Sequence, residues 1–289
     1  MKPKLLWTPS AERAEQASIA RFARAVGREG GYDELWRWSV DDLEGFWGAI
    51  RRFFDVQASE PYERVLGRRE MPGAEWFPGS RLSYAEHFFR DRDDDTVAIR
   101  HASELRELSQ WTWGELREQT ARIAAGLKAM GIERGDRVVA YMPNIPETIA
   151  AFLATASLGA VWSSCSPDFG ARSVVDRFAQ IEPKVLLAVD GYRYGGKDFD
   201  RGELLERARS EMPSLEHTVI LPYLSDTGDW DEAFPPTDEE LTFDRVPFDH
   251  PLWVLYSSGT TGLPKAIVHS QGGILVEHLK KHNLHLDLQ

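Results

Sequence analysis

A short run of small, hydroxylated and basic residues follows a strongly apolar segment near the end of the chain. It begins at Tyr256, has the sequence Tyr-Ser-Ser-Gly-Thr-Thr-Gly-Leu-Pro-Lys, and ends at Lys265. The apolar residues 252–256 before it are predicted to form a buried strand. Glycine adopts main-chain conformations that are closed to other residues and lets backbone N–H groups approach an anion. This segment is therefore predicted to be a phosphate-binding loop.

The hydroxyls of this loop add hydrogen-bond donors, and Lys265 adds a mobile positive charge. We expect Lys265 to be the catalytic residue. The predicted phosphate-binding residues are Ser257, Ser258, Gly259, Thr260, Thr261, Gly262 and Lys265. The loop is not a Walker A motif, which requires G-x-x-x-x-G-K-[ST]. A surface turn rich in Ser, Gly and Thr is the alternative, and the fixed order of so many residue types disfavours it.

A second glycine-rich segment, residues 191–197, follows a predicted strand over 184–189. Its sequence Gly-Tyr-Arg-Tyr-Gly-Gly-Lys comes close to Walker A, but Asp198 stands where Ser or Thr would hold Mg²⁺. A P-loop NTPase that uses this segment is therefore a minor alternative. An exposed, solvated turn is a further interpretation of this segment and of its basic residues Arg193 and Lys197.

The elements that position these segments alternate between strand and helix. Such alternation predicts an α/β fold with a mainly parallel sheet flanked by helices. The predicted strands cover 137–141, 184–189, 218–221, 252–256 and 266–270, with another starting at Val161. Capping boxes at Ser83 and at Thr112, each with Glu three residues later, predict the starts of two helices.

The first 75 residues differ from the rest and are predicted to form a small helical region. Ile19, Phe22 and Ala23 recur at helical spacing, with Gly27 as a stop. A second helix is predicted to start at the N-cap Ser39, and its apolar stripe over 43–54 is expected to pack within the protein. Residues 76–289 are predicted to form one larger domain.

Composition excludes several classes of protein. The chain has 289 residues, is 42% hydrophobic and carries a net charge of −12, which disfavours non-specific nucleic-acid binding. Its single cysteine, Cys165, excludes an internal disulfide and is expected to be buried and structural. The dense apolar part of residues 148–167 is too short to span lipid. We expect a cytoplasmic protein with small-molecule partners and no membrane or nucleic-acid partner, while association into an oligomer stays open.

The loop ending at Lys265 resembles the phosphate-loop motif of the acyl-adenylate-forming superfamily, which includes acyl-CoA synthetases, luciferases and peptide-synthetase adenylation domains. Residues 251–273 and 159–170 resemble acetoacetyl-CoA synthetases within the acetyl-CoA synthetase branch. The aromatic helix over 39–54 resembles the N-terminal region of that branch. The resemblance covers essentially the whole chain, and residues 76–289 resemble the N-terminal part of an AMP-binding (adenylation) domain.

The resemblance implies ATP-dependent ligation of acetoacetate, or another short-chain acid, to CoA through an acyl-adenylate. It implies ATP, Mg²⁺ and CoA, with the loop on the β- and γ-phosphates and with Arg193 and Lys197 on CoA phosphates. Tyr194 stands where that branch often has Arg, so the CoA match is loose. No protein metal ligand is predicted.

Members of this superfamily continue about as far again beyond the residue that matches Gln289. The sequence contains no Tyr-Gly-x-Thr-Glu motif for adenine and Mg²⁺, and the ribose-binding Asp and the C-terminal-domain Lys are also absent. We therefore expect the chain to be the N-terminal part of a ligase and to be inactive by itself. The alternative is a non-catalytic nucleotide-binding or structural fragment that needs a C-terminal half.

Overall fold

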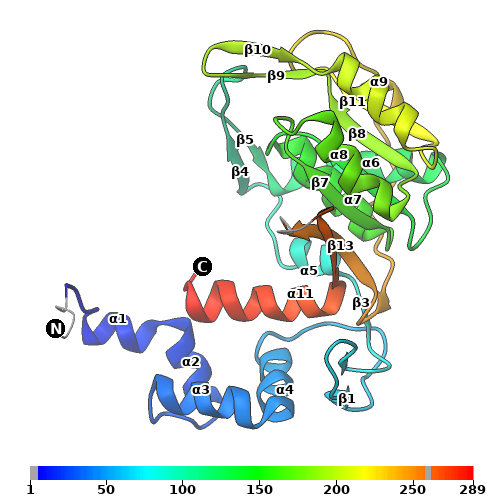
Figure 1. The fold of residues 1–289 in the computed structure, drawn as a ribbon. Coiled ribbons are helices and arrows are strands. Elements are labelled where there is room, and N and C mark those ends of the chain that lie inside the picture. Colours follow the sequence, from blue (N-terminus) through cyan, green and yellow to red (C-terminus); the bar gives the residue numbers. More distant parts are fainter. Residues whose placement is uncertain (1–5, 258–261, 289) are drawn as a thin grey trace. The chain divides into compact units, whose positions relative to one another are not determined.

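The computed structural model describes residues 6–257 and 262–288, which fall into two compact units. The first unit comprises the residues up to Arg81 together with 247–249 and 272–288, and the second comprises 82–246 and 250–271 (Figure 1). The first unit thus combines segments from both ends of the chain. The division into sequence domains at residue 75 stays a prediction.

The first unit is mainly helical. Its helices are α1 (Ala11–Gln16), α2 (Ser18–Ala25), α3 (Tyr32–Asp41), α4 (Leu43–Phe53), most of α11 (Gln271–His278) and the π-helix η2 (Leu279–His285). A small antiparallel pair, β1 (Leu66–Arg68) with β2 (Glu75–Trp76), follows α4. Phe22, Phe46 and Ile50 are buried, so the predicted apolar stripe packs within its own unit.

The prediction that Ser39 caps the second helix is wrong. Helix α3 continues past Ser39 to Asp41, and the Ser39 hydroxyl donates a hydrogen bond back to the Trp36 carbonyl at 2.7 Å. Asp42 caps α4 instead, by accepting from the Gly45 N–H at 2.9 Å. Serine in mid-helix can bond to the preceding turn, so its residue type alone does not mark a helix start.

The second unit is built on a six-stranded sheet with the order β11-β8-β6-β7-β13-β14. The strands are β6 (Arg137–Tyr141), β7 (Val161–Cys165), β8 (Val185–Val189), β11 (His217–Leu221), β13 (Pro251–Ser257) and β14 (Lys265–Ser270). All neighbours run parallel except β13 and β14, which are antiparallel. This confirms the predicted α/β fold with a mainly parallel sheet.

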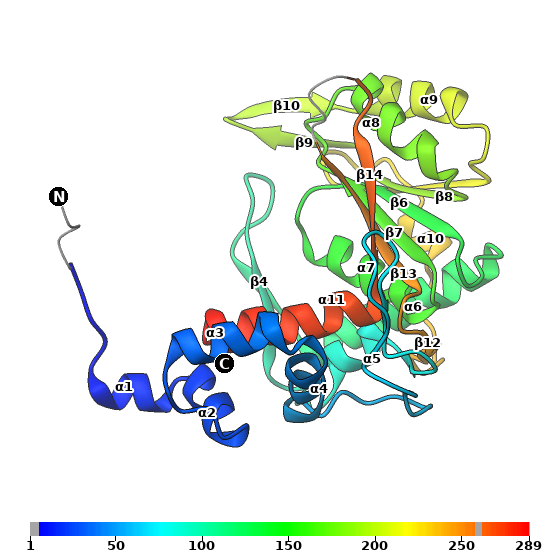
Figure 2. The ribbon, with the colours of Figure 1, turned by 60° about the horizontal axis from the view of Figure 1, so that its bottom comes forward.

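Helices cover both faces of the sheet, and strand β8 accordingly is apolar and buried along its whole length. The helices are α5 (Tyr84–Phe89), α6 (Trp113–Ala129), α7 (Pro146–Ser157), α8 (Ala171–Phe178) with a 3₁₀ turn over Ala179–Ile181, α9 (Gly202–Glu211) and α10 (Trp230–Ala233). Figure 2 shows α8 and α9 on one side of the sheet and α6 and α7 on the other. On the α8–α9 side, Val139 and Leu186 pack with Phe178 and Leu205 in one buried cluster.

Local sequence determines where the helices of this unit begin. The Thr112 hydroxyl accepts from the Glu115 N–H at 3.2 Å, and the Glu115 carboxylate accepts from the Thr112 N–H at 2.6 Å, which confirms the predicted capping box. Ser83 also caps α5 by accepting from the Glu86 N–H, whereas the Glu86 carboxylate forms an ion pair with Arg245 at 2.6 Å.

Two antiparallel hairpins accompany the sheet. One pairs β4 (Val97–His101) with β5 (Ser109–Thr112), and the other pairs β9 (Gly191–Tyr194) with β10 (Lys197–Asp200).

The short strands β3 (Arg81–Leu82) and β12 (Val246–Pro247) lie where the chain passes from one unit to the other. Among the residues that the structure describes, none of the helices has the length and apolar character needed to cross a membrane.

Candidate functional site

The predicted phosphate loop connects β13 to β14. Residues Ser258, Gly259, Thr260 and Thr261 lie outside the described residues. The two strands pair in register up to the loop, so that Ser257 lies directly opposite Lys265. Side chains of directly opposed residues in an antiparallel pair share one face of the sheet. The hairpin therefore brings the first hydroxyl and the lysine of the motif together from positions eight residues apart in sequence.

The described part of the loop is open to solvent. Gly262 and Lys265 are exposed, and the Leu263 side chain is 61% exposed. Gly262 has a φ of +152°, a main-chain conformation that residues with side chains rarely adopt. Apart from its chain neighbours, no heavy atom of the described residues lies within 4 Å of the position that a Cβ would take there. Glycine is thus required at this position by the backbone conformation and not by close packing.

The loop lies at the edge of the sheet where ligands of α/β proteins usually bind. Since β6, β7, β8, β11 and β13 are parallel, their carboxyl ends meet at one edge. The chain goes from β6 to β7 on one side and then crosses to β8 on the other side of β6, which creates a topological switch point between β6 and β8. Such switch points carry ligand crevices in open α/β sheets. Ser257 at the end of β13 is therefore close in the sheet to this switch point, with β7 and β6 between them.

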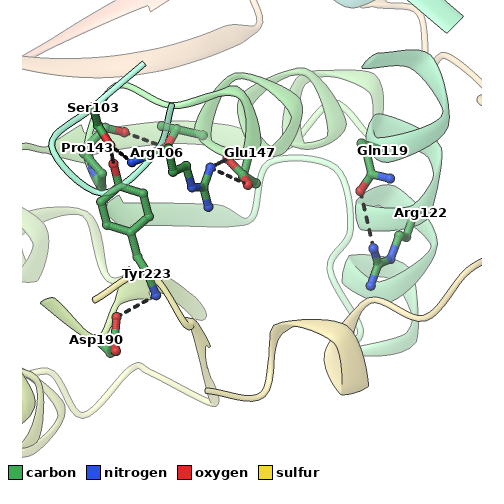
Figure 3. A network of polar contacts seen from close by, with 9 residues as sticks. Ser103, Arg106, Gln119, Arg122, Pro143, Glu147, Asp190 and Tyr223 are labelled. Carbon is green, nitrogen blue, oxygen red and sulfur yellow. Dashed lines mark hydrogen bonds and ion pairs between the residues drawn. The ribbon is translucent and has the colours of Figure 1, made fainter. Parts of the chain in front are cut away.

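A polar network lies at the same edge and was not predicted from the sequence (Figure 3). Arg106, from the turn between β4 and β5, forms two hydrogen bonds with the Glu147 carboxylate at 2.8 and 3.0 Å. Its guanidinium also lies over the ring of Tyr223, 4.7 Å from the ring centre. The Tyr223 hydroxyl donates to Ser103 at 2.7 Å. The network joins the β4–β5 turn to the segments that follow β6 and β11.

Asp190 fixes the segment after β11 from the carboxyl end of β8. Its carboxylate accepts from the N–H groups of Tyr223, Leu224 and Ser225 at 2.7, 2.8 and 2.7 Å, and from the Ser225 hydroxyl at 2.6 Å. Burial acts to raise the pKa of this carboxyl, but the hydrogen bonds outweigh burial and hold the pKa below its usual value. Asp190 is therefore ionised at neutral pH and stabilises the backbone of this edge.

The second glycine-rich segment is a β-hairpin and not a P-loop, so the P-loop NTPase hypothesis is wrong. Walker A mechanics need a strand, a loop and then a helix that starts after the lysine. Here Lys197 begins strand β10, which pairs back on β9. The N–H groups of Gly195 and Gly196 are each bound at 2.7 Å by the Glu104 carboxylate.

The two basic residues of this hairpin have different surroundings. Arg193 forms an ion pair with Asp198 at 2.6 Å, and this hydrogen bond raises the pKa of Arg193. Lys197 is exposed. Asp198, the residue that does not fit Walker A, is thus the partner of Arg193, and both basic residues are exposed.

Cys165 lies at the end of β7 and is 5% exposed, which confirms the prediction of a buried free cysteine. Burial raises the pKa of its thiol to about 12. The thiolate, which is the nucleophilic form, is therefore disfavoured at neutral pH. In the part of the chain that the structure describes, no three His, Cys, Asp or Glu side chains gather closely enough to hold a metal ion.

The family of AMP-binding enzymes matches residues 86–287, more than half of the chain. The chain belongs to the AMP-binding enzyme family. A second family, the acetyl-coenzyme A synthetase N-terminus, matches residues 32–88. Both matches confirm the resemblance seen in the sequence.

Relatives of this AMP-binding chain include acetoacetyl-CoA synthetases. The chain is 42% identical to the one from Danio rerio, covering 99% of the chain and 46% of the relative. It is 41% identical to the one from Rhizobium meliloti, covering 98% and 46%. The solved structure of acetoacetyl-CoA synthetase from Streptomyces lividans matches with a TM-score of 0.94 and 54% identity, over 99% of this chain and 46% of that one. The chain spans about half the length of the curated relatives it matches.

The structure of this AMP-binding chain places its predicted site residues in two separate hairpins. Ser257, Gly262 and Lys265 lie in the β13–β14 hairpin at the edge of the main sheet, whereas Arg193 and Lys197 lie in the β9–β10 hairpin. The roles of these residues in binding ATP and CoA stay predictions.

Proposed function

We propose that this chain is the ATP phosphate-binding part of an acid–CoA ligase that acts on acetoacetate. The observation that carries the proposal is the β13–β14 hairpin, in which Ser257 and Lys265 face each other at the carboxyl edge of an AMP-binding fold. The names of the relatives support acetoacetate as the acid and CoA as the acceptor.

In the proposed reaction an acetoacetate carboxylate oxygen attacks the α-phosphorus of ATP, and pyrophosphate leaves. The CoA sulfur then attacks the acyl carbon, and AMP leaves. The protein supplies no nucleophile in this scheme, so its contribution is to position the substrates and to stabilise charge. Lys265 and the loop would hold the β- and γ-phosphates, which carry the charge of the departing pyrophosphate.

We propose that Mg²⁺ is held mainly by phosphate oxygens, since this ion is usually bound through substrate phosphates. Lys197 would contact a phosphate of CoA because it is exposed on the β9–β10 hairpin. Arg193 would contact a phosphate of CoA only by sharing its guanidinium between that phosphate and Asp198.

Release of pyrophosphate with a panel of acids tests the proposal. A full-length ligase that contains this sequence is expected to release pyrophosphate faster with acetoacetate than with acetate, propionate or medium-chain acids, because the relatives reported above are named acetoacetyl-CoA synthetases. A preference for acetate would overturn the assignment of the acid and leave the adenylation chemistry in place. Release with none of the acids, from folded protein that binds ATP, would contradict the ligase proposal.

A further inference from the structure

Residues on both sides of the loop between β13 and β14 are hydrogen-bonded to one short stretch of chain, which comprises the end of helix α8 and the 3₁₀ turn after it. The Tyr256 hydroxyl donates a hydrogen bond to the Arg177 carbonyl at 2.8 Å. The Gln180 side-chain amide donates to the Pro264 carbonyl at 3.0 Å. Tyr256 directly precedes Ser257, and Pro264 directly precedes Lys265. Figure 2 shows α8 next to the start of β14.

Helix α8 is a firm support for these contacts. Phe178 is fully buried in the cluster that joins α8 to the sheet, together with Val174 and Val175. The last carbonyls of a helix lack N–H partners further along the helix. The Tyr256 hydroxyl is a donor to one of these carbonyls, that of Arg177. Gln180 also donates to the Asp176 carbonyl at 2.5 Å, which ties its side chain to the same helix.

The Tyr256 ring is held as well as its hydroxyl. The Arg177 guanidinium lies between two aromatic rings, 4.9 Å from the centre of Phe169 and 6.0 Å from that of Tyr256. Burial raises the pKa of Tyr256 to about 12, so the hydroxyl keeps its proton at neutral pH and remains a donor. The contact with Arg177 therefore persists over the pH range in which an enzyme of this family would work.

We propose that the end of α8 is a clamp that fixes Ser257 and Lys265 for the phosphates of ATP, with Tyr256 and Gln180 as positioning residues. The inference rests on the proposed function and deepens it. The pairing of β13 with β14 fixes the two strands against each other, and β7 pairs with β13 at Trp253, whereas the clamp fixes the loop end of the hairpin to α8 and the turn after it. Ligand-binding groups must be held to within about 0.5 Å to act together. Loss of the clamp should therefore weaken ATP binding more than it weakens folding.

The test uses two substitutions that remove one donor each, Tyr256→Phe and Gln180→Met. Matched controls make the same changes away from the hairpin. Tyr32→Phe removes the hydroxyl of an exposed tyrosine of α3, and Gln119→Met alters a side chain that accepts from Arg122. Three quantities are measured on the chain: the Kd for Mg-ATP by titration calorimetry, deuterium exchange of the peptide covering residues 251–270, and the Tm.

Each clamp variant is expected to weaken ATP binding about 3- to 10-fold, the value of one hydrogen bond. Exchange in residues 251–270 should speed up while the Tm stays close to that of the unmodified chain. The controls should leave exchange in this peptide and ATP affinity unchanged. Because each substitution frees one end of the same hairpin, the double variant should lose less than the product of the two single effects.

Unchanged exchange at 251–270 in both clamp variants would overturn the clamp, and so would equal losses in the controls. The exchange measurement needs no nucleotide, so it judges the clamp even if the unmodified chain fails to bind ATP. Failure of the unmodified chain to bind ATP would instead contradict the proposed function.

Discussion

Replacing Gly262 by valine is expected to weaken Mg-ATP binding by about 10- to 100-fold. The φ of +152° at Gly262 is rarely open to residues with side chains, and forcing such a residue into an unfavourable backbone region costs about 1–3 kcal/mol. Apart from its chain neighbours, no described heavy atom lies within 4 Å of its Cβ position, so the loss would come from the altered backbone of the loop. Titration calorimetry with Mg-ATP measures the effect.

Gly170→Val is the matched control for this experiment. Gly170 has an ordinary φ of −71°, and among the described residues other than its chain neighbours no heavy atom lies within 4 Å of its Cβ position. The control should keep ATP affinity within about twofold, because valine is compatible with its extended backbone. Equal affinities of the Gly262→Val variant and the unmodified chain would contradict the assignment of the loop to phosphates.

Replacing Asp190 by alanine is expected to destabilise the second unit by about 2–3 kcal/mol, because it leaves three backbone N–H groups without their charged acceptor. Urea unfolding at pH 7, followed by circular dichroism, measures the change. Asp226→Ala is the control, because Asp226 is an exposed carboxylate one residue beyond Ser225. A loss of less than about 0.5 kcal/mol at Asp190, or an equal loss in the control, would contradict the structural role of this carboxylate.

The Asp190 effect should depend on pH with a definite sign. The folded pKa of Asp190 lies below its usual value, since hydrogen bonds to the ionised form outweigh burial. Its contribution to stability is therefore fully present above the unfolded value of about 3.9 and is lost as the pH falls through the lower folded pKa. The difference between the unmodified chain and Asp190→Ala should shrink below about pH 4.

Features that rest on short stretches of sequence were predictable. The capping box at Thr112 and Glu115 predicted the start of α6, because both partners lie within one turn. The apolar run before Ser257 predicted strand β13, and a glycine-rich loop after it indicated a phosphate site. The Ser39 cap failed because the hydroxyl of a serine can bond within a helix as well as at its start.

Features that join distant segments were not predictable from a single sequence. Arg106 and Glu147 are 41 residues apart, and nothing in their local patterns indicates that they pair. The Glu104 carboxylate accepts from the N–H groups of Gly195 and Gly196, which are 91 and 92 residues away in the sequence. The sequence of the turn alone therefore does not reveal this partner. The contact between Gln180 and Pro264 is of the same kind. Such pairs depend on strand order, which the alternation of elements leaves open.

A comparison of ATP and AMP affinities in the Lys265→Met variant of a full-length ligase that contains this sequence tests the central claim most directly, namely that the β13–β14 hairpin holds the terminal phosphates of ATP. Lys265 is exposed at the start of β14, so methionine should leave the fold intact. Lys197→Met on the other hairpin is the control. We predict that Lys265→Met lowers ATP affinity by about tenfold, leaves AMP affinity within about twofold, and that the control changes neither. Equal losses for ATP and AMP, or no loss for ATP, would contradict the claim.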